Sequence, residues 1–217
     1  MHTLILGDCT SGKSYIGKKL AAEFMRTGRK VFVLNPIGDK WPADFQTWDP
    51  AEFLDYCRSP QHQDGAIFID EAGDAFAEGK LTWLATRGRH FGHACFFIGQ
   101  RYTLVPKTVR ALCSTLYLFA SHPDDCIELA GDFNDEGLRD AYKQQRGHFL
   151  FKKKFHPLRR GVINFAAGTV DIGKEGDQHD RAFFENRGQP HQQRESDDGE
   201  HRARPGGNVR HRRRDAR

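Results

Sequence analysis

A glycine-rich octapeptide near the start of the chain has the composition and spacing of a phosphate-binding loop. It fits the pattern GxxxxGK[ST] in full and consists of Gly7, Asp8, Cys9, Thr10, Ser11, Gly12, Lys13 and Ser14. The two glycines allow the backbone to curl so that successive N–H groups face a phosphate. Lys13 is expected to contact the β- and γ-phosphates of ATP, and Ser14 to offer its hydroxyl to Mg²⁺.

A pair of carboxylates follows a short apolar run further along the chain. The run IFI leads into Asp70 and Glu71, the form of a Walker B strand. Asp70 is expected to hold Mg²⁺ through water, and Glu71 to orient and polarise the water that attacks the γ-phosphate. Enzymes that transfer phosphate to a small substrate have less need of such a group, so Glu71 favours hydrolysis. The alternative is a strand that simply ends in polar residues.

Three further side chains are candidates for catalysis. Gln100 follows the apolar run CFFIG, and in a parallel sheet it would lie at the same crevice and hydrogen-bond the γ-phosphate or the attacking water. Arg87 and Arg89 are alternative candidates for an arginine finger that reaches the phosphates of a neighbouring subunit. There are competing interpretations, in which Gln100 only caps its strand and either arginine is a surface residue or a contact to DNA phosphates.

The order of apolar runs predicts how these residues are positioned. HTLILGD is typical of a buried parallel strand, and the residues after the loop have helical spacing. VFVL, AIFI, CFFIG and TLYLFA predict further strands, with helical stretches near 51–57, 81–87 and 107–112 between them and another near 124–130 after the last. This alternation indicates an α/β fold in which helices cover both faces of a mostly parallel sheet.

The C-terminal part of the chain differs from the part before it. A β-hairpin is predicted at about 147–166, with the basic residues Lys152, Lys153, Lys154, Arg159 and Arg160 in its middle. We assign 1–168 to the ATPase domain. The segment 169–217 is mostly polar, ends in a basic cluster at 210–217, and is expected to form a disordered tail. Either basic group would suit DNA phosphates. The alternatives are that the first group solubilises the hairpin and that the terminal group docks on an acidic viral partner.

Composition excludes some classes of protein. The 217 residues carry a formal net charge of +4, which permits a nucleic-acid partner without requiring one. The five cysteines show no metal-ligand spacing, which favours reduced thiols, and no metal other than Mg²⁺ is expected. No apolar run approaches the ~20 residues of a membrane span, and the N-terminus lacks the features of a signal peptide.

The ordered set of motifs resembles a known superfamily. GDCTSGKS, AIFIDEAGD, TRGRHFG and FFIGQR follow one another within residues 7–101. Together they are similar to the FtsK/HerA superfamily of DNA-pumping ATPases, in particular the packaging ATPases of tailless, membrane-containing icosahedral phages, and also to Zot-like ATPases. The resemblance covers residues 1–120.

This resemblance implies a RecA-like P-loop NTPase core and a ring, expected to be a hexamer, with nucleotide sites between subunits. It further implies that double-stranded DNA passes through the ring, that a viral portal, vertex or membrane protein is the partner, and that the protein works in the host cytoplasm and at the packaging vertex of the virion. The matched positions give Lys13 and Ser14 phosphate and magnesium binding, Asp70 and Glu71 the Walker B roles, and Gln100 the sensor role.

Three other functions compete with genome packaging. One is a nucleotide-switched binding module with slow turnover, against which Glu71 argues. A Zot-like protein of phage assembly or extrusion usually has a membrane span after its ATPase domain, and none is visible in this sequence. A nucleoside kinase also pairs a phosphate loop with Asp-Glu, but such kinases usually add a zinc site built from CxxC pairs, which this chain lacks.

Overall fold

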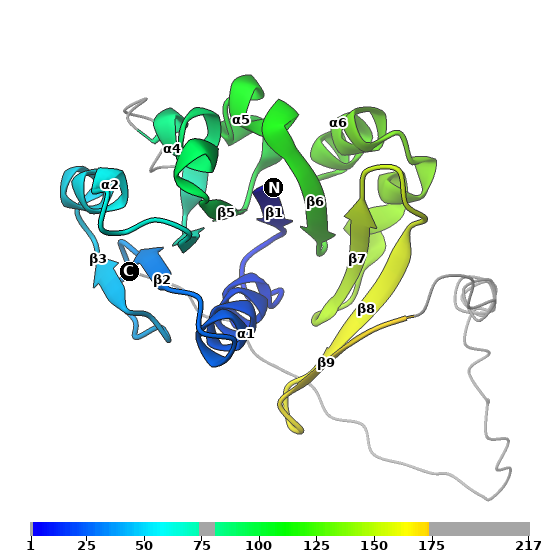
Figure 1. Ribbon diagram of the computed structural model, residues 1–217. Coiled ribbons are helices and arrows are strands. Elements are labelled where there is room, and N and C mark those ends of the chain that lie inside the picture. Colours follow the sequence, from blue (N-terminus) through cyan, green and yellow to red (C-terminus); the bar gives the residue numbers. More distant parts are fainter. Residues whose placement is uncertain (1, 74–80, 174–217) are drawn as a thin grey trace, which may run out of the picture. The chain divides into compact units, whose positions relative to one another are not determined.

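A single mixed sheet runs through the fold (Figure 1). The computed structural model describes residues 2–73 and 81–173. Over these residues nine strands pair in the order β3-β2-β4-β5-β1-β6-β7-β8-β9. They are β1 (His2–Leu6), β2 (Val31–Leu34), β3 (Phe45–Thr47), β4 (Ala66–Ile69), β5 (Ala94–Gly99), β6 (Cys113–Leu118), β7 (His148–Lys153), β8 (Arg159–Asn164) and β9 (Thr169–Ile172).

The strands from β3 to β6 in this order are parallel, and helices connect many of them. The α-helices are α1 (Lys13–Arg26), α2 (Pro50–Arg58), α4 (Thr82–Thr86), α5 (Lys107–Leu112) and α6 (Pro123–Phe133). Short 3₁₀ helices occupy η1 (Gly88–Phe91), η2 (Tyr102–Leu104) and η3 (Glu136–Lys143). The predicted α/β alternation and mostly parallel sheet are therefore confirmed.

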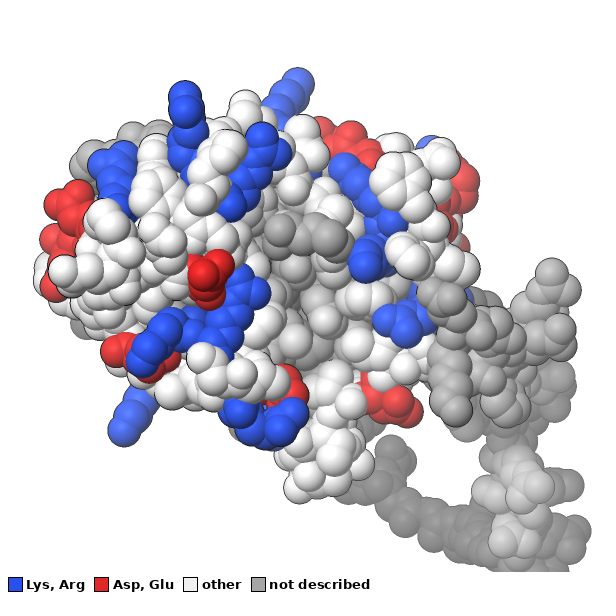
Figure 2. Space-filling model, in the orientation of Figure 1, with Lys and Arg blue, Asp and Glu red and all other residues white. Residues whose placement is uncertain are grey.

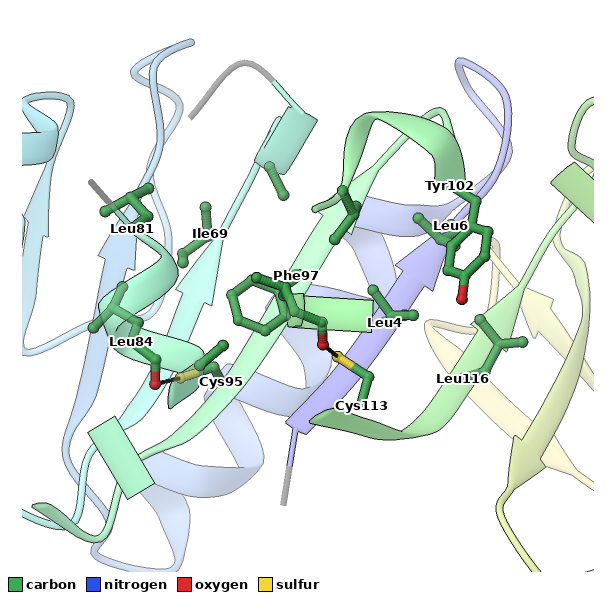
Figure 3. Close-up of a cluster of buried hydrophobic side chains, with 14 of the residues drawn as sticks. Leu4, Leu6, Ile69, Leu81, Leu84, Cys95, Phe97, Tyr102, Cys113 and Leu116 are labelled. Atoms are coloured by element: carbon green, nitrogen blue, oxygen red, sulfur yellow. Dashed lines mark hydrogen bonds between the residues drawn. The ribbon is translucent and has the colours of Figure 1, made fainter. Parts of the chain in front are cut away.

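Each face of the sheet has its own hydrophobic core. Successive side chains of a strand point to opposite faces, and in β1 Leu4 and Leu6 belong to one buried cluster while Ile5 belongs to the other. The first cluster lies under α2, α4, α5 and α6, and Figure 3 shows Leu4, Phe97 and Leu116 in it. The second lies under α1, which is alone on its side of the parallel strands in Figure 1. The prediction of helices on both faces is confirmed.

Three antiparallel strands extend the sheet beyond β6. β7 pairs with β6 and β8 with β7, which gives a hairpin where the sequence predicts one. β9 pairs with β8 and lies in the segment that the sequence assigns to the tail. The sequence did not predict this strand because it is short and only Val170 and Ile172 are apolar; both pack on the second cluster. Most of the predicted tail, including the basic cluster at 210–217, lies outside the described residues.

The parallel strands define two edges of the sheet. The carboxyl edge consists of the residues that follow the strands, among them Gly7, Asp70 and Gln100. The amino edge consists of the residues that begin or precede them, among them His2, His93 and Cys113. Of the helices that the structure describes, none is long and apolar enough to cross a membrane.

Candidate active site

The octapeptide Gly7–Ser14 forms a tight loop between β1 and α1, at the carboxyl edge. Its start is fixed to the strands on both sides of β1, because Gly7 N–H donates to the Gly99 carbonyl (3.3 Å) and Asp8 N–H to the Ala120 carbonyl (2.6 Å). A Cβ at position 7 would lie 2.6 Å from the Cβ of Phe119, so only glycine fits there. The central strands of the sheet thus hold the loop in place.

The second glycine of the loop marks the start of α1. Gly12 has φ 121°, a conformation that residues with a side chain rarely adopt. A Cβ at this position would also lie 2.7 Å from the Cδ1 of Ile163. No side chain caps this helix and its first turn holds no acidic residue. The N–H groups and the positive end of the helix dipole therefore suit an anion in the loop.

Lys13 places a buried cation within the loop. Its side chain is 7% exposed, and its Nζ donates to the Asp8 carbonyl at 2.8 Å. Burial lowers the pKa of the ammonium, and the nearby acidic groups, of which Glu71 acts most strongly, oppose that change. The predicted phosphate-binding lysine and the predicted water activator therefore lie close together.

Asp70 lies at the same site, next to Ser14 at the end of the loop. Its carboxylate follows β4, is 4% exposed, and accepts hydrogen bonds from the Ser14 hydroxyl and from Glu71 N–H (3.1 Å). Burial raises the pKa of Asp70 in spite of these bonds. Ser14 and Asp70 thus bring two oxygen atoms together, and oxygen ligands are what Mg²⁺ prefers. The residues fit that ion.

The backbone turns sharply at the second carboxylate. Glu71 has φ 51°, in the left-handed region that is uncommon for residues other than glycine. The sequence motif gives no sign of this conformation. This conformation turns the chain out of the direction of β4. The Glu71 carboxylate is then close enough for its charge to act on Lys13.

Gln100 lies between the loop and the carboxylates. β5 is the strand between β1 and β4, so the residue that follows it is at the carboxyl edge and between both halves of the site. Gln100 is exposed there. Its neighbour Arg101 donates from Nε to the buried carboxylate of Asp125 at 2.8 Å, and this carboxylate also accepts Tyr102 N–H (3.0 Å). No sequence motif marks Asp125, because the contact joins residues far apart in the chain.

The two candidate finger arginines are not near the loop of their own chain. Arg87 ends α4 and Arg89 lies in η1, which precedes β5 at the amino edge. The charge of Arg89 acts on His2, the first residue of β1. Both arginines are exposed. The structure brings Lys13, Ser14, Asp70, Glu71 and Gln100 to one edge and leaves both arginines at the other.

A cleft of about 240 Å³ opens beside the loop, and part of its wall comes from the C-terminal strands. It is lined by Thr10, Gly12, Lys13, Ser14, Tyr15, Arg146 and Phe165. The sequence motifs do not include Arg146 or Phe165, which flank the β7–β8 hairpin. Nothing in a local pattern could have identified them, since only the position of the hairpin on the sheet brings them to the loop.

The basic residues of the hairpin are engaged within the fold. Lys152 is buried and donates to Asp135 and to the His156 carbonyl, both at 2.6 Å. The Lys154 ammonium and the Arg159 guanidinium lie over aromatic rings, those of Phe133 and Phe151. On the face shown in Figure 2, Lys and Arg lie in several separate groups. Lys152 therefore pairs within the fold and is not a surface residue that solubilises the hairpin.

The fold and the arrangement at the carboxyl edge define a class of protein. A phosphate loop between the central strand and the first helix, with an Asp-Glu pair after a nearby parallel strand, is the architecture of a P-loop NTPase. No protein-family profile and no curated protein sequence matches the chain.

Solved structures narrow this class by their fold. B204, the genome packaging NTPase of Sulfolobus turreted icosahedral virus 2, in complex with AMPPCP, is similar with a TM-score of 0.58 and 14% identity, over 79% of this chain and 96% of that chain. B204, the DNA-packaging ATPase of Sulfolobus turreted icosahedral virus, gives 0.59 and 13%, over 80% and 96%. The cytoplasmic domain of the type VII secretion ATPase EccC of Thermomonospora curvata gives 0.55 and 17%, over 78% and 26%. The chain has the fold of the FtsK/HerA-type P-loop ATPases.

Proposed function

We propose that the chain binds ATP together with Mg²⁺ at the phosphate loop and hydrolyses the nucleotide. The meeting of Lys13, Ser14, Asp70 and Glu71 supports this most directly. These residues offer a cation for phosphate oxygens, two oxygen ligands for magnesium and a carboxylate for water, which are the groups that phosphoryl transfer to water requires. The B204 structures with AMPPCP and ATP-gammaS support the same class of ligand.

In this proposal the loop holds the phosphates. Lys13 exchanges the Asp8 carbonyl for β- and γ-phosphate oxygens, and the N–H groups at the start of α1 complete the cradle. Because Lys13 is buried, its charge acts with less screening by water than a surface lysine would. Ser14 and Asp70 hold Mg²⁺, which neutralises charge on the phosphate oxygens when bound.

The residues around the γ-phosphate prepare the attacking water. Glu71 orients this water and accepts its proton. Gln100, at the end of the strand between the two halves of the site, hydrogen-bonds the γ-phosphate or the water. The cis site contains no arginine finger from positions 87 or 89, because both lie at the amino edge. We propose that one of them completes the site of a neighbouring subunit in a ring, expected to be a hexamer.

The work done by hydrolysis is proposed to be the movement of double-stranded DNA, most specifically the packaging of a viral genome into a preformed capsid. The sequence resemblance and the fold shared with the two B204 packaging proteins support this step. The proposal places the ring at the packaging vertex of a virion in the host cytoplasm, with a portal, vertex or membrane protein as its partner.

The test is steady-state ATP hydrolysis with and without double-stranded DNA, over a range of protein concentrations. For a DNA motor with shared sites, we expect DNA to stimulate turnover, and we expect this stimulation to grow with protein concentration. Lys13→Ala serves as the inactive control. DNA-independent turnover would count against a motor. Turnover that requires a nucleoside would instead identify a kinase.

Mixing inactive variants tests which arginine acts in trans. Lys13→Ala subunits keep both arginines, while Arg87→Ala or Arg89→Ala subunits keep the loop. If Arg87 is the finger, mixing Arg87→Ala with Lys13→Ala restores part of the activity, because some interfaces then hold one intact copy of each group. The same mixture with Arg89→Ala identifies the other residue. No recovery from either mixture, when both arginine variants are inactive alone, would contradict a shared site.

A further inference from the structure

The β7–β8 hairpin is attached directly to the phosphate loop. Gly147 N–H, just before β7, donates to the Ser11 carbonyl at 3.0 Å. At the same end of the hairpin, Ile163 in β8 donates its N–H to the Gly147 carbonyl at 2.8 Å. Ile163 and Phe165 both pack over Gly12, where a Cβ would lie 2.7 Å and 3.5 Å from them. The residues that flank the hairpin therefore lie next to the loop and next to any ligand bound in it.

These flanking residues form an aromatic and cationic group in the cleft. The guanidinium of Arg146 lies 5.0 Å from the centroid of the Phe165 ring. Tyr15, the residue after Ser14, meets Phe165 edge to face, with 5.3 Å between ring centroids and 72° between planes. Phe165 is 39% exposed and Arg146 is exposed, so neither is part of a core. All three line the cleft.

The chemistry of this group suits a flat aromatic ligand better than a phosphate. Bases stack on aromatic side chains and on the plane of a guanidinium group, while a phosphate makes no use of a ring face. The phosphate groups of a nucleoside triphosphate already have the loop, the start of α1 and Lys13. The rest of the nucleotide extends from the loop, and the cleft lined by Tyr15, Arg146 and Phe165 opens directly there.

We propose that this cleft is the subsite for the nucleobase, in which a base stacks against the Phe165 and Arg146 pair while Tyr15 forms the side of the subsite. This inference rests on the proposed binding of ATP, and it makes the C-terminal hairpin part of the nucleotide site. The domain that binds nucleotide accordingly includes strands that lie beyond the parallel sheet.

Binding of two ligands by the full chain separates the base from the phosphates. Titration calorimetry is done with ATP and with inorganic tripolyphosphate, both with Mg²⁺. Phe165→Ala should weaken ATP binding by roughly 5- to 150-fold, the range found when one stacking partner is removed, and leave tripolyphosphate binding unchanged. Arg146→Ala should act in the same direction, and Phe165→Tyr should keep the affinity for ATP.

Matched controls exist in the same hairpin. Phe155 is fully exposed in the turn between β7 and β8, and Arg159 lies 4.6 Å from the Phe151 ring, both outside the cleft. Phe155→Ala and Arg159→Ala should leave ATP binding unchanged. Phe165→Ala with the affinity of the wild-type chain for ATP would overturn the base subsite while the ATP site stands. Equal losses for ATP and tripolyphosphate would also overturn it, because the hairpin would then only support the loop. A wild-type chain that binds neither ligand would overturn the proposed function itself.

Discussion

At the amino edge of the sheet, two buried histidines use both ring nitrogens in hydrogen bonds within the chain, whereas at the carboxyl edge buried polar groups gather around a cleft. His2 Nδ1 accepts Cys95 N–H at 3.1 Å and its Nε2 donates to the Ala85 carbonyl at 3.0 Å. His93 repeats the arrangement, accepting Gly65 N–H (3.1 Å) and donating to the Cys57 carbonyl (2.9 Å). Each imidazole uses both nitrogens in its neutral form.

The carboxyl edge is built for a different purpose. Lys13 is a cation held in a position where burial lowers its pKa, and Asp70 is a carboxyl group whose pKa burial raises. The hydroxyl of Ser11 is buried without a hydrogen-bond partner among the described residues. Glu71 has a left-handed backbone. These features lower stability, and such residues gather where proteins bind ligands. The comparison agrees with the proposal that the carboxyl edge binds the ligand while the amino edge stabilises the fold, so variants should separate the two effects.

The largest effect is expected from Glu71→Gln at the carboxyl edge. Loss of the group that accepts the proton from water should lower kcat by about 10²–10⁴-fold, while ATP affinity stays within a few-fold because Gln keeps the shape of the side chain. Single-turnover hydrolysis together with equilibrium binding measures both quantities. A variant with full turnover would remove the argument for Glu71 as the water activator.

Lys13→Ala should come next. Loss of the ammonium from the phosphates should weaken ATP binding and turnover by about 10²–10³-fold each, and thermal unfolding should show no loss of stability, because a partly desolvated cation is removed. Titration calorimetry measures the ATP affinity, and a thermal melt of the same sample measures Tm. A large fall in Tm would show that Lys13 is a structural residue, contrary to the contrast between the edges.

His2→Ala should produce the reverse pattern. Its removal leaves Cys95 N–H and the Ala85 carbonyl buried without their partner, so the free energy of unfolding should fall by about 2–4 kcal/mol. ATP turnover per folded molecule should not change, since the site is at the other edge. Denaturant unfolding and an activity assay at a temperature where the variant is folded provide the measurements.

A smaller effect is expected from pH. Burial lowers the pKa of His2 to about 4, and that of His93 is lowered for the same reason. Below pH 6.5 the unfolded chain binds protons that the folded chain does not, so the free energy of unfolding should fall as the pH drops toward 4. His2 alone should account for about 2 kcal/mol by pH 5.

His2→Gln provides the matched comparison, because glutamine can donate and accept without titrating in this range. The stability of the wild-type chain should fall more steeply than that of this variant between pH 6.5 and pH 5. Parallel curves would show that His2 takes up its proton equally in the folded and the unfolded chain.

The sequence predicted the parts of the fold that depend on local pattern. Buried strands such as β4 and the glycine loop before α1 have strong signals, since four successive apolar residues or a GxxxxGK[ST] pattern need no knowledge of distant contacts. From these the α/β fold and the residues of the carboxyl edge follow, because parallel strands end at a common edge. The roles of these residues stay proposals until the variants are measured.

The features that the sequence did not predict all depend on contacts between distant segments. Arg146 and Phe165 reach the loop only because β7 pairs with β6 next to β1. Lys152 looked like a surface cation, but it pairs with Asp135 of a separate segment. The left-handed turn at Glu71 is imposed by the surrounding structure and not by residue type.

The hydrogen bond between Gly147 and Ser11 has a consequence for any attempt to shorten this protein. A fragment that ended after β6 would contain every motif of the sequence, from GDCTSGKS to FFIGQR, yet it would lose the partner of the Ser11 carbonyl and the side chains that cover Gly12. It would also uncover the Phe119 ring, whose centroid lies 5.3 Å from that of Phe149. The smallest unit able to hold the loop in its shape is therefore longer than its motifs, and it extends through the hairpin to Ile163, whose Cδ1 lies against Gly12.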